Sequence, residues 1–504
     1  MTMTMTDPER IPVIIGVGQV NDRPEDPDLG LDSLGLMVAA LKVAEADAGG
    51  GILADLDSLA IVDQISFRDL GNLCEPLAAA IGATPAVNYQ SAAPHGDTPV
   101  RLLNEAANRI GAGEIKLAAI VGGEALRTAA GRAAKRALGE DKSYNAVRAV
   151  SNRREPNYAQ LHGLSAPVDV YPLYENATRA AWGQNLAEAQ GESAAIWSRF
   201  SEVAAANDGA WIRKPASPDA ILTIDERNRP IAFPYSKLMV ANSSVNQGAG
   251  FIVTSIAEAW RRGIPEDRLI HIGMGAAAKE TANILHRDRY DGSVSMETSI
   301  NRTLDLNGMT AADFDHVELY SCFPCVPKMA RRTLSWPVDR PATVFGGLTF
   351  GGGPIANYMS HAIVSMVEKL RSEGRYGFLF ANGGFATDNH CIILGKERIA
   401  AASFPQDFDY QAEADAARGA VPELVKDYAG PATIETYTVF YGRDGSPKAG
   451  VVAARTPEGA RTLAHVDVSD GAMLAFLTDG VAEPVGTAGQ IVSLGEDHFG
   501  WRAA

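Results

Sequence analysis

Four mainly apolar stretches that run into glycine turns dominate the pattern of the chain. They lie at residues 11–20, 115–125, 269–277 and 376–386. Continuous apolar runs of this length are typical of strands buried on both faces, and runs with helical spacing separate them. The pattern therefore predicts an α/β protein whose sheets are covered by helices on both sides.

The glycines of the first half recur in the second half in the same order. Gly16 matches Gly273, Gly18 matches Gly275 and Gly96 matches Gly353, each 257 positions apart, and Gly122 matches Gly383 at 261. Gly96 and Gly353 each open a run of apolar residues at helical spacing. Landmarks that repeat in order at a nearly constant offset predict two similar α/β halves.

Two segments break this pattern. Residues 126–230 are polar and helix-prone, so we expect an inserted domain within a first half that spans residues 1–255. The second half is predicted at 256–402. Residues 403–504 become β-rich, and Asp444-Gly445 marks a hairpin turn between two strands, so a separate C-terminal β domain is expected.

Length and charge narrow the class of protein. The chain has 504 residues, of which 46% are apolar, enough for a large core and about two to four domains. A net charge of -16 disfavours binding to nucleic acid. Four cysteines do not make a disulfide framework, no leader-like segment precedes Ile11, and no run reaches about 18 apolar residues. We expect a cytoplasmic protein without a membrane span.

Several motifs together resemble the thiolase superfamily, and in particular its sterol-carrier-protein-type branch. These motifs are VGGEA after the second apolar stretch, VELYSCF in the second half, and PYSKLMVANSSVNQGAGFIV at 234–253. The resemblance covers residues 10–400. With its added C-terminal domain, the chain looks most like the thiolase-like proteins of type one. The resemblance implies a duplicated five-layered αβαβα core, an inserted loop domain and a small, possibly OB-like, β domain.

The resemblance also implies acyl transfer with coenzyme A, as in acetyl-CoA acetyltransferases. Such enzymes acylate a cysteine at a helix N-terminus, activate it with a histidine in a Gly-His-Pro loop, and use a second cysteine as acid and base. Here these three positions fall on Gly96, Gly353 and Ala381, and Tyr320 replaces a further family histidine. The usual catalytic set is missing, so ordinary thiolase turnover is expected to be absent or very slow.

Other polar residues could converge on the vacated site. Cys322 is a substitute nucleophile or a small core residue. His361 is a base or a buried helix residue. His95 and Asp97 flank Gly96 as an acid and a base, or simply form a turn and a helix cap. Asn382 is an oxyanion donor or satisfies its own loop. Further candidates are Tyr320, Asp388 and His390.

The two closely spaced cysteines of the CFPC motif do not indicate a metal site. A redox or zinc role for Cys322 and Cys325 would need a helix after the first cysteine or two further ligands at suitable spacing, and the sequence offers neither. We therefore expect no bound metal.

Coenzyme A is expected as a substrate or ligand, and no tightly bound cofactor is expected. By the resemblance, the inserted domain would hold its nucleotide, and its phosphates could meet Arg127, Arg132 and Arg136. The backbone of Gly352 and Gly353 could hold a thioester or carboxylate oxygen. The resemblance implies a homodimer, although the added domain leaves a monomer open.

Two functions from different classes remain open at this stage. The first is an enzyme that forms or breaks a carbon–carbon bond of a coenzyme A thioester or β-keto acid without the usual cysteine. The second is a catalytically silent protein that binds acyl-coenzyme A or a partner subunit. A dinucleotide-binding oxidoreductase is disfavoured, because Gly16-x-Gly18 lacks the third glycine of the fingerprint.

Overall fold

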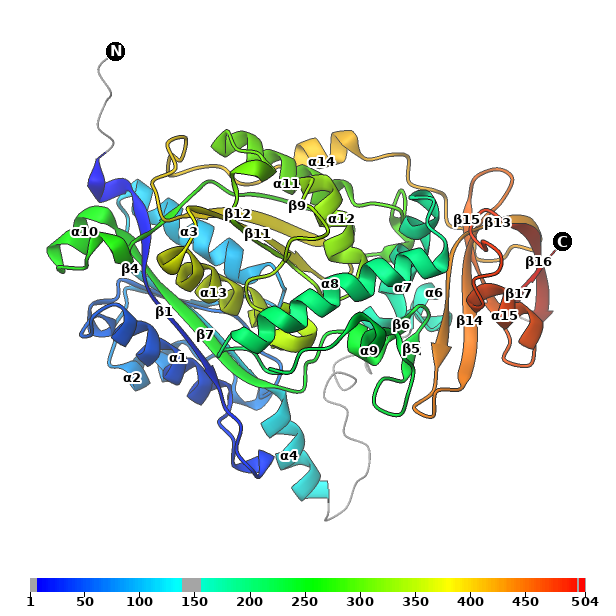
Figure 1. Ribbon diagram of the computed structural model, residues 1–504, viewed down its shortest axis with the longest axis horizontal. Helices are drawn as coiled ribbons and strands as arrows, with labels where there is room; N and C mark the ends of the chain where they lie inside the picture. The colour runs from blue at the N-terminus through cyan, green and yellow to red at the C-terminus, as the bar shows by residue number, and fades with distance from the viewer. Residues whose placement is uncertain (1–6, 138–155, 496–497, 504) are drawn as a thin grey trace.

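The computed structural model describes residues 7–137, 156–495 and 498–503. A layered α/β body makes up most of the molecule, and a β domain packs against one end of it (Figure 1). None of the described helices is both long enough and apolar enough to cross a membrane.

The body is built on ten paired strands that run from one half of the chain into the other. Their order is β10-β11-β12-β8-β1-β7-β4-β2-β3, and β9 pairs with β12. The two halves meet where β1 pairs with β8. The strands are β1 Pro12–Asn21, β2 Ser58–Ile61, β3 Val87–Gln90, β4 Leu117–Ala125, β7 Asn246–Ser255, β8 Ile270–Ile272, β9 Ala276–Lys279, β10 His316–Leu319, β11 Tyr376–Gly383 and β12 Asp388–Gly395.

All four apolar stretches form strands, but the third is divided between β8 and β9. The division follows from pairing, because Ile272 faces Leu394 of β12 whereas Ala276 faces Cys391 of the same strand. The limits that we gave to the two halves and to the C-terminal domain stay predictions.

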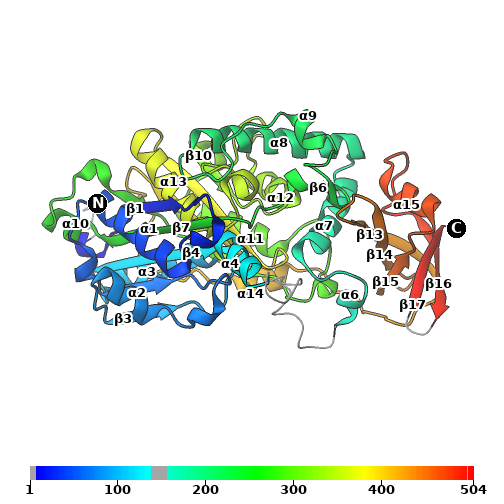
Figure 2. The same ribbon diagram turned by 90° about the horizontal axis from the view of Figure 1, so that it is seen from below.

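Helices form three layers around these strands, which confirms the expected five-layered core (Figures 1 and 2). The middle layer contains α3 Thr98–Ala112 and α13 Tyr358–Ser372, and both helices contact strands of both halves. The outer face of the first half carries α1 Ser33–Asp47, α2 Cys74–Ile81 and α10 Ile256–Arg261; that of the second half carries α11 Val294–Asn307 and α12 Cys325–Leu334.

The segment between the halves is helical, as predicted. It contains α4 Leu126–Ala137, α6 Tyr158–Leu161, α7 Pro167–Ala181, α8 Leu186–Ala206 and α9 Pro218–Leu222. Local sequence explains where α8 starts, since the side chain of Asn185 accepts from the backbone of Glu188 while Glu188 reaches back to Asn185. The next strands, β5 Pro230–Ala232 and β6 Tyr235–Ser236, extend the sheet of the C-terminal domain.

The C-terminal domain is a small closed barrel. It contains β13 Gly430–Tyr441, β14 Pro447–Arg455, β15 Arg461–Val466, α15 Gly471–Thr478, β16 Ala488–Gly495 and β17 His498–Ala503, and α14 Gln411–Ala417 precedes it. The order β14-β15-β17-β16-β13 closes because β13 also pairs with β14. The predicted turn is present between β13 and β14, where Gly445 has φ +80, a left-handed conformation that suits glycine.

A buried arginine ties the barrel to the body. Arg461 donates to the carbonyls of Leu285 and Arg287, at 2.7 and 2.6 Å, and to both carboxylate oxygens of Glu435. Its side chain is fully buried. A buried guanidinium that has so many acceptors holds the two domains in one relative position.

Candidate functional site

The N-terminus of α3 lies at the predicted centre of the site, but no side chain fits at Gly96. A Cβ atom there would come 2.2 Å from the backbone oxygen of Asn382 and 2.7 Å from the phenol oxygen of Tyr320. Real Cβ atoms do not approach other atoms so closely. The place of the family's nucleophile is therefore closed by two groups from the second half of the chain.

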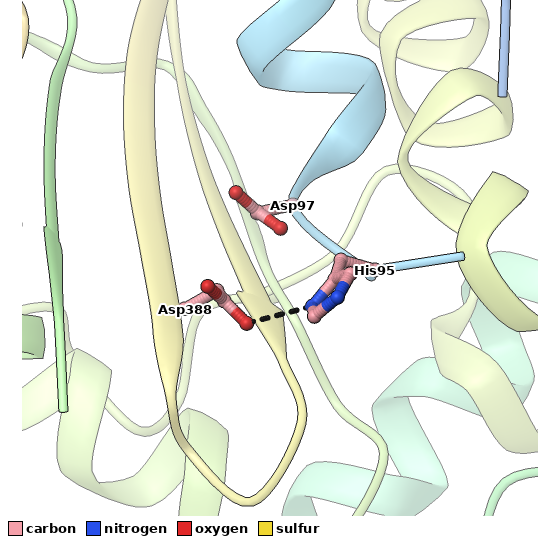
Figure 3. A group of neighbouring side chains, drawn as sticks. All are labelled: His95, Asp97 and Asp388. Carbon is pink, nitrogen blue, oxygen red and sulfur yellow. Dashed lines mark hydrogen bonds and ion pairs between the residues drawn. The ribbon is translucent and has the colours of Figure 1, made fainter. Parts of the chain in front are cut away.

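A polar cluster lies next to this closed position, and Figure 3 shows three of its members, His95, Asp97 and Asp388. His95 Nδ1 lies 2.8 Å from Asp388 Oδ2, and Lys279 Nζ lies 3.1 Å from Asp388 Oδ1. The side chain of His95 is 49% exposed, whereas that of Asp388 is 5% exposed. The cluster thus joins the turn before α3 to the start of β12, and its His95 and Lys279 side chains are open to solvent.

Asp97 is the unusual member of this cluster. Asp97 is buried, and its side chain neither caps α3 nor accepts a hydrogen bond from the described residues. Figure 3 shows it beside His95 and Asp388, and the ligand-type atoms of all three lie within 4.8 Å of one another. A buried carboxylate without a partner is costly as an anion, so Asp97 favours its protonated form.

The pKa values of the cluster follow from this geometry. The hydrogen bond to Asp388 raises the pKa of His95 despite partial burial. Burial would raise the pKa of Asp388, but His95 and Lys279 outweigh it and lower that pKa. Burial, and then the charge of Asp388, raise the pKa of Asp97. The cluster therefore places a carboxyl group and an imidazole whose pKa values are raised beside a carboxylate whose pKa is lowered.

Tyr320 and Asn382 complete the wall around Gly96. Burial raises the pKa of Tyr320 well above its usual value, so its phenol stays a neutral hydrogen-bond donor. The side chain of Asn382 is engaged at both ends: its oxygen accepts from Tyr171 at 2.9 Å and its nitrogen donates to Asn389 at 2.9 Å. Asn382 thus holds the wall in place, and its role as an oxyanion donor stays a prediction.

Cys322 lies close to this wall but is poorly suited to attack a substrate. Burial raises the pKa of its thiol to about 12, so very little thiolate exists near neutral pH. Cys325 is buried in the first turn of α12, and both cysteines are free thiols. A nucleophilic role for Cys322 stays a prediction that this environment disfavours.

His361 and His390 are both fully buried. His361 lies in the first turn of α13, which begins at Tyr358. It stacks on Phe345, and its Nδ1 lies 2.9 Å from Gln19 Oε1. Burial lowers the pKa of both histidines to about 3, so both rings are neutral at physiological pH.

The glycine-rich loop uses most of its donors internally. Gly353 N donates to Asn242 O at 2.8 Å, and the N–H groups of Gly346 and Gly347 bond to Thr343 Oγ1. Gly352 and Gly353 are both buried. The predicted role of these two glycines in holding a ligand oxygen therefore requires the loop to open.

The arginines of α4 differ in how many of their hydrogen-bond donors already have partners. Arg132 donates to the carbonyls of Asp28 and Gly30 and stacks on Phe67. Arg127 has a buried Nε with no hydrogen-bond partner. The side chain of Arg136 lies outside the described residues. Of the three predicted phosphate ligands, Arg127 thus has unused donor capacity.

Sequence reasoning missed Lys279. Lys279 and Asp388 face each other across β9 and β12, and this register sets their contact. In the sequence the two residues are 109 positions apart, and nothing in the local pattern connects them.

Comparison with known proteins gives the family. Residues 410–496 match the family model of the thiolase-like protein type 1 additional C-terminal domain. A monomeric SCP2-thiolase-like protein type 1 from Mycobacterium smegmatis is 30% identical, with a TM-score of 0.81 over 99% of this chain and 100% of that chain. This chain belongs to the family of SCP2-thiolase-like proteins of type 1.

More distant structures share the fold. The Ltp2-ChsH2(DUF35) aldolase is 16% identical, with a TM-score of 0.57 over 77% of this chain and 98% of that chain. The dimeric peroxisomal thiolase of Saccharomyces cerevisiae is 14% identical, with a TM-score of 0.56 over 78% and 99%. No match was found among curated protein sequences.

Proposed function

We propose that this protein makes or breaks a carbon–carbon bond next to a coenzyme A thioester or β-keto carbonyl, and that it does so without an acyl-cysteine. The observation that carries the proposal is the cluster of His95, Asp97 and Asp388 beside the closed position of Gly96. Enolate chemistry requires a base and an acid close together, and the polar atoms of these three side chains lie within 4.8 Å of one another.

The same residues support a direct acyl transfer to coenzyme A. His95, oriented by Asp388, takes the proton of the coenzyme A thiol, and the sulfur attacks the β-keto carbon. The bond between the carbonyl carbon and the α-carbon then breaks. Its electron pair stays on the second acyl fragment as an enolate, which Asp97 protonates, and the proton of His95 returns to Asp97. Tyr320 donates a hydrogen bond to a carbonyl oxygen, where negative charge develops.

A silent binding protein is the second candidate. Two observations favour it: the position of the nucleophile is filled, and the N–H of Gly353 is already bonded to Asn242. In that case the thiolase-like body would bind acyl-coenzyme A, and the barrel would contact a partner. We infer an OB-like barrel from its strand order and from α15, which lies between β15 and β16.

The test is exchange of the α-protons of an acyl thioester with deuterated solvent, followed by NMR and mass spectrometry. This measurement detects enolate formation even when the second substrate is unknown. We expect exchange with the wild-type protein, a loss of about a hundredfold in His95→Gln, and no loss in His286→Gln, an exposed histidine outside the cluster. Coenzyme A binding without exchange, and no products from a panel of β-keto acids and β-keto thioesters, would favour the silent protein.

A further inference from the structure

Arg23 is held in an extended position without a counter-charge. Its guanidinium lies 4.2 Å from the centre of the Trp211 ring. Its Nη2 donates to the carbonyls of Ala210 and Trp211, and within the described chain no carboxylate pairs with it. The stacking and the two carbonyls fix the plane of the guanidinium, while its Nε and Nη1 make no hydrogen bond to the described residues.

Two further arginines are brought to the same place by neighbouring backbone contacts. Arg127 N donates to Val245 O, and Asp22 N, one residue before Arg23, donates to Asn246 O. The carbonyls that hold Arg23 belong to the loop that carries Arg213. We call Arg23, Arg127 and Arg213 the arginine cluster.

The arginine cluster has little negative charge to balance it. Arg127 forms no ion pair in the described structure, and its buried Nε is without a partner. Among the described residues, Arg213 pairs only with Asp208, whose side chain is 93% exposed, and such exposed pairs contribute little to stability. The nearby carboxylates of Asp26 and Asp28 are bonded to Lys135.

The positive charges of the arginine cluster repel one another, as expected where few carboxylates balance them. Burial, followed by the charges of Arg213 and Arg127, lowers the pKa of Arg23. In a chain with 61 acidic and 45 basic residues, an uncompensated group of guanidiniums is unexpected unless an anion joins it.

The arginine cluster lies at the same edge of the sheet as the candidate site. β1 and β4 both run antiparallel to β7, and β4 is parallel to β2, which is parallel to β3. The carboxyl ends of β1 and β4 therefore share an edge with the carboxyl end of β3, from which the chain enters α3 through Gly96. Arg23 follows β1 and Arg127 follows β4. Ligands of open α/β sheets bind along this edge.

We propose that the arginine cluster is a binding site for a phosphate-bearing anion. Guanidinium groups bind phosphate oxygens through paired hydrogen bonds, and three of them match a diphosphate better than a single carboxylate. The step from a diphosphate to the phosphates of coenzyme A rests on the proposed function. Anion binding itself does not.

The experiment is titration calorimetry at low salt with inorganic pyrophosphate, adenosine 3′,5′-bisphosphate and coenzyme A. The variants are Arg23→Gln, Arg127→Gln and the double variant. Arg340→Gln is a matched control, because Arg340 stacks on Trp336 at 3.9 Å and donates to the carbonyls of Phe314 and Asp315. Circular dichroism checks that each variant folds.

We expect each single variant to weaken pyrophosphate binding by about tenfold, because each removes a charged hydrogen-bonding partner, and the control to leave binding unchanged. Wild-type binding should also weaken as salt rises. Absence of pyrophosphate binding by the wild-type protein, or equal binding by the double variant and the control, would overturn the proposal. Coenzyme A binding tighter than pyrophosphate identifies the nucleotide as the ligand; equal binding identifies free phosphates.

A nucleotide-free substrate separates this proposal from the proposed function. Thioesters of N-acetylcysteamine carry the reacting group without phosphates. If the α-protons of these thioesters exchange but pyrophosphate does not bind, the anion-binding role of the arginine cluster is rejected and the proposed function is retained. If pyrophosphate binds but no α-proton exchanges, the anion-binding role is retained and the proposed function is rejected.

Discussion

The phenol oxygen of Tyr320 lies 2.7 Å from the point that a Cβ atom at Gly96 would occupy. Tyr320 comes from the second half of the chain and Gly96 from the first, so the second half closes the position in which the first half would have placed a nucleophile. Loss of the cysteine is therefore accompanied by a repacked wall. Restoring one side chain cannot restore a thiolase site.

Gly96→Cys should fold less stably and should not gain an acyl adduct. The new side chain would clash with Asn382 and Tyr320, and overpacking of this kind costs about 1–3 kcal/mol. Thermal unfolding and intact mass after exposure to acyl-coenzyme A measure both effects. Gly191→Cys is the control, since a Cβ at Gly191 meets nothing within 4 Å. A stable, acylated Gly96→Cys would show that the wall is not closed.

Asp388→Asn should lower the pKa of His95. The bond to Asp388 raises this pKa above 6.5, so its contribution to stability is present below pH 6.5 and is lost as the pH rises through the folded value. NMR titration of the His95 ring should give a pKa above 6.5 in the wild-type protein and at or below 6.5 in the variant. Asp97→Asn should shift it less, because Asp97 acts only through space. An unchanged pKa in Asp388→Asn would contradict the ion pair.

Cys322 should be unreactive in the folded protein. A rise in thiol pKa from 9.0 to about 12 lowers the thiolate fraction about a thousandfold. Alkylation by iodoacetamide, followed by peptide mass spectrometry, should modify Cys322 quickly only after denaturation. Cys322→Ser should also retain α-proton exchange. Rapid labelling of Cys322 in the native state would contradict this prediction. So would an acyl adduct that forms on the wild-type protein and is absent from Cys322→Ser, because it would identify Cys322 as the nucleophile.

Three stacked histidines lie where the barrel meets α6, and they predict that the stability of the protein falls at acid pH. The ring of His465 stacks on those of His162 and His498, with centroids 4.4 and 4.6 Å apart. Burial and the neighbouring histidines lower the pKa of His465 to about 4. The stability that depends on a neutral His465 is present above pH 6.5 and is lost as the pH falls towards 4, by at most about 3 kcal/mol.

His465→Phe keeps an aromatic ring but cannot be protonated. Unfolding by urea at pH 7.5 and pH 5 should show a smaller loss of stability at acid pH in this variant than in the wild-type protein. His286→Phe, an exposed position outside the stack, is the control. Equal acid sensitivity of the wild-type protein and His465→Phe would contradict the role of the stack.

Arg461→Met should loosen the barrel. The variant leaves the carbonyls of Leu285 and Arg287 without a donor and removes one of the two arginines paired with Glu435. Breaking a buried pair in this way costs about 3–5 kcal/mol. Hydrogen exchange should increase in β13 to β15 and at residues 285–287. Arg443→Met, in the exposed β13–β14 turn, is the control. Unchanged protection in Arg461→Met would show that other contacts hold the barrel.

The pattern of the sequence was sufficient for much of the fold. The long apolar stretches formed strands because a strand buried on both faces needs continuous apolar residues, and Asp444-Gly445 formed its turn because Gly445 adopts positive φ. The split between β8 and β9 was not predictable, since it depends on how β12 pairs with each of them.

The sequence alone led to the prediction that the family's catalytic cysteines and histidine are missing, because residue types can be compared without coordinates. It also pointed to His95 and Asp97 through their positions next to Gly96. Only the tertiary structure decided that Tyr320 fills the vacated place, that Asp388 contacts both His95 and Lys279, and that Arg23 lies near Arg127. Each of these contacts joins residues that are far apart along the chain, and their distance depends on strand register and packing rather than on local sequence.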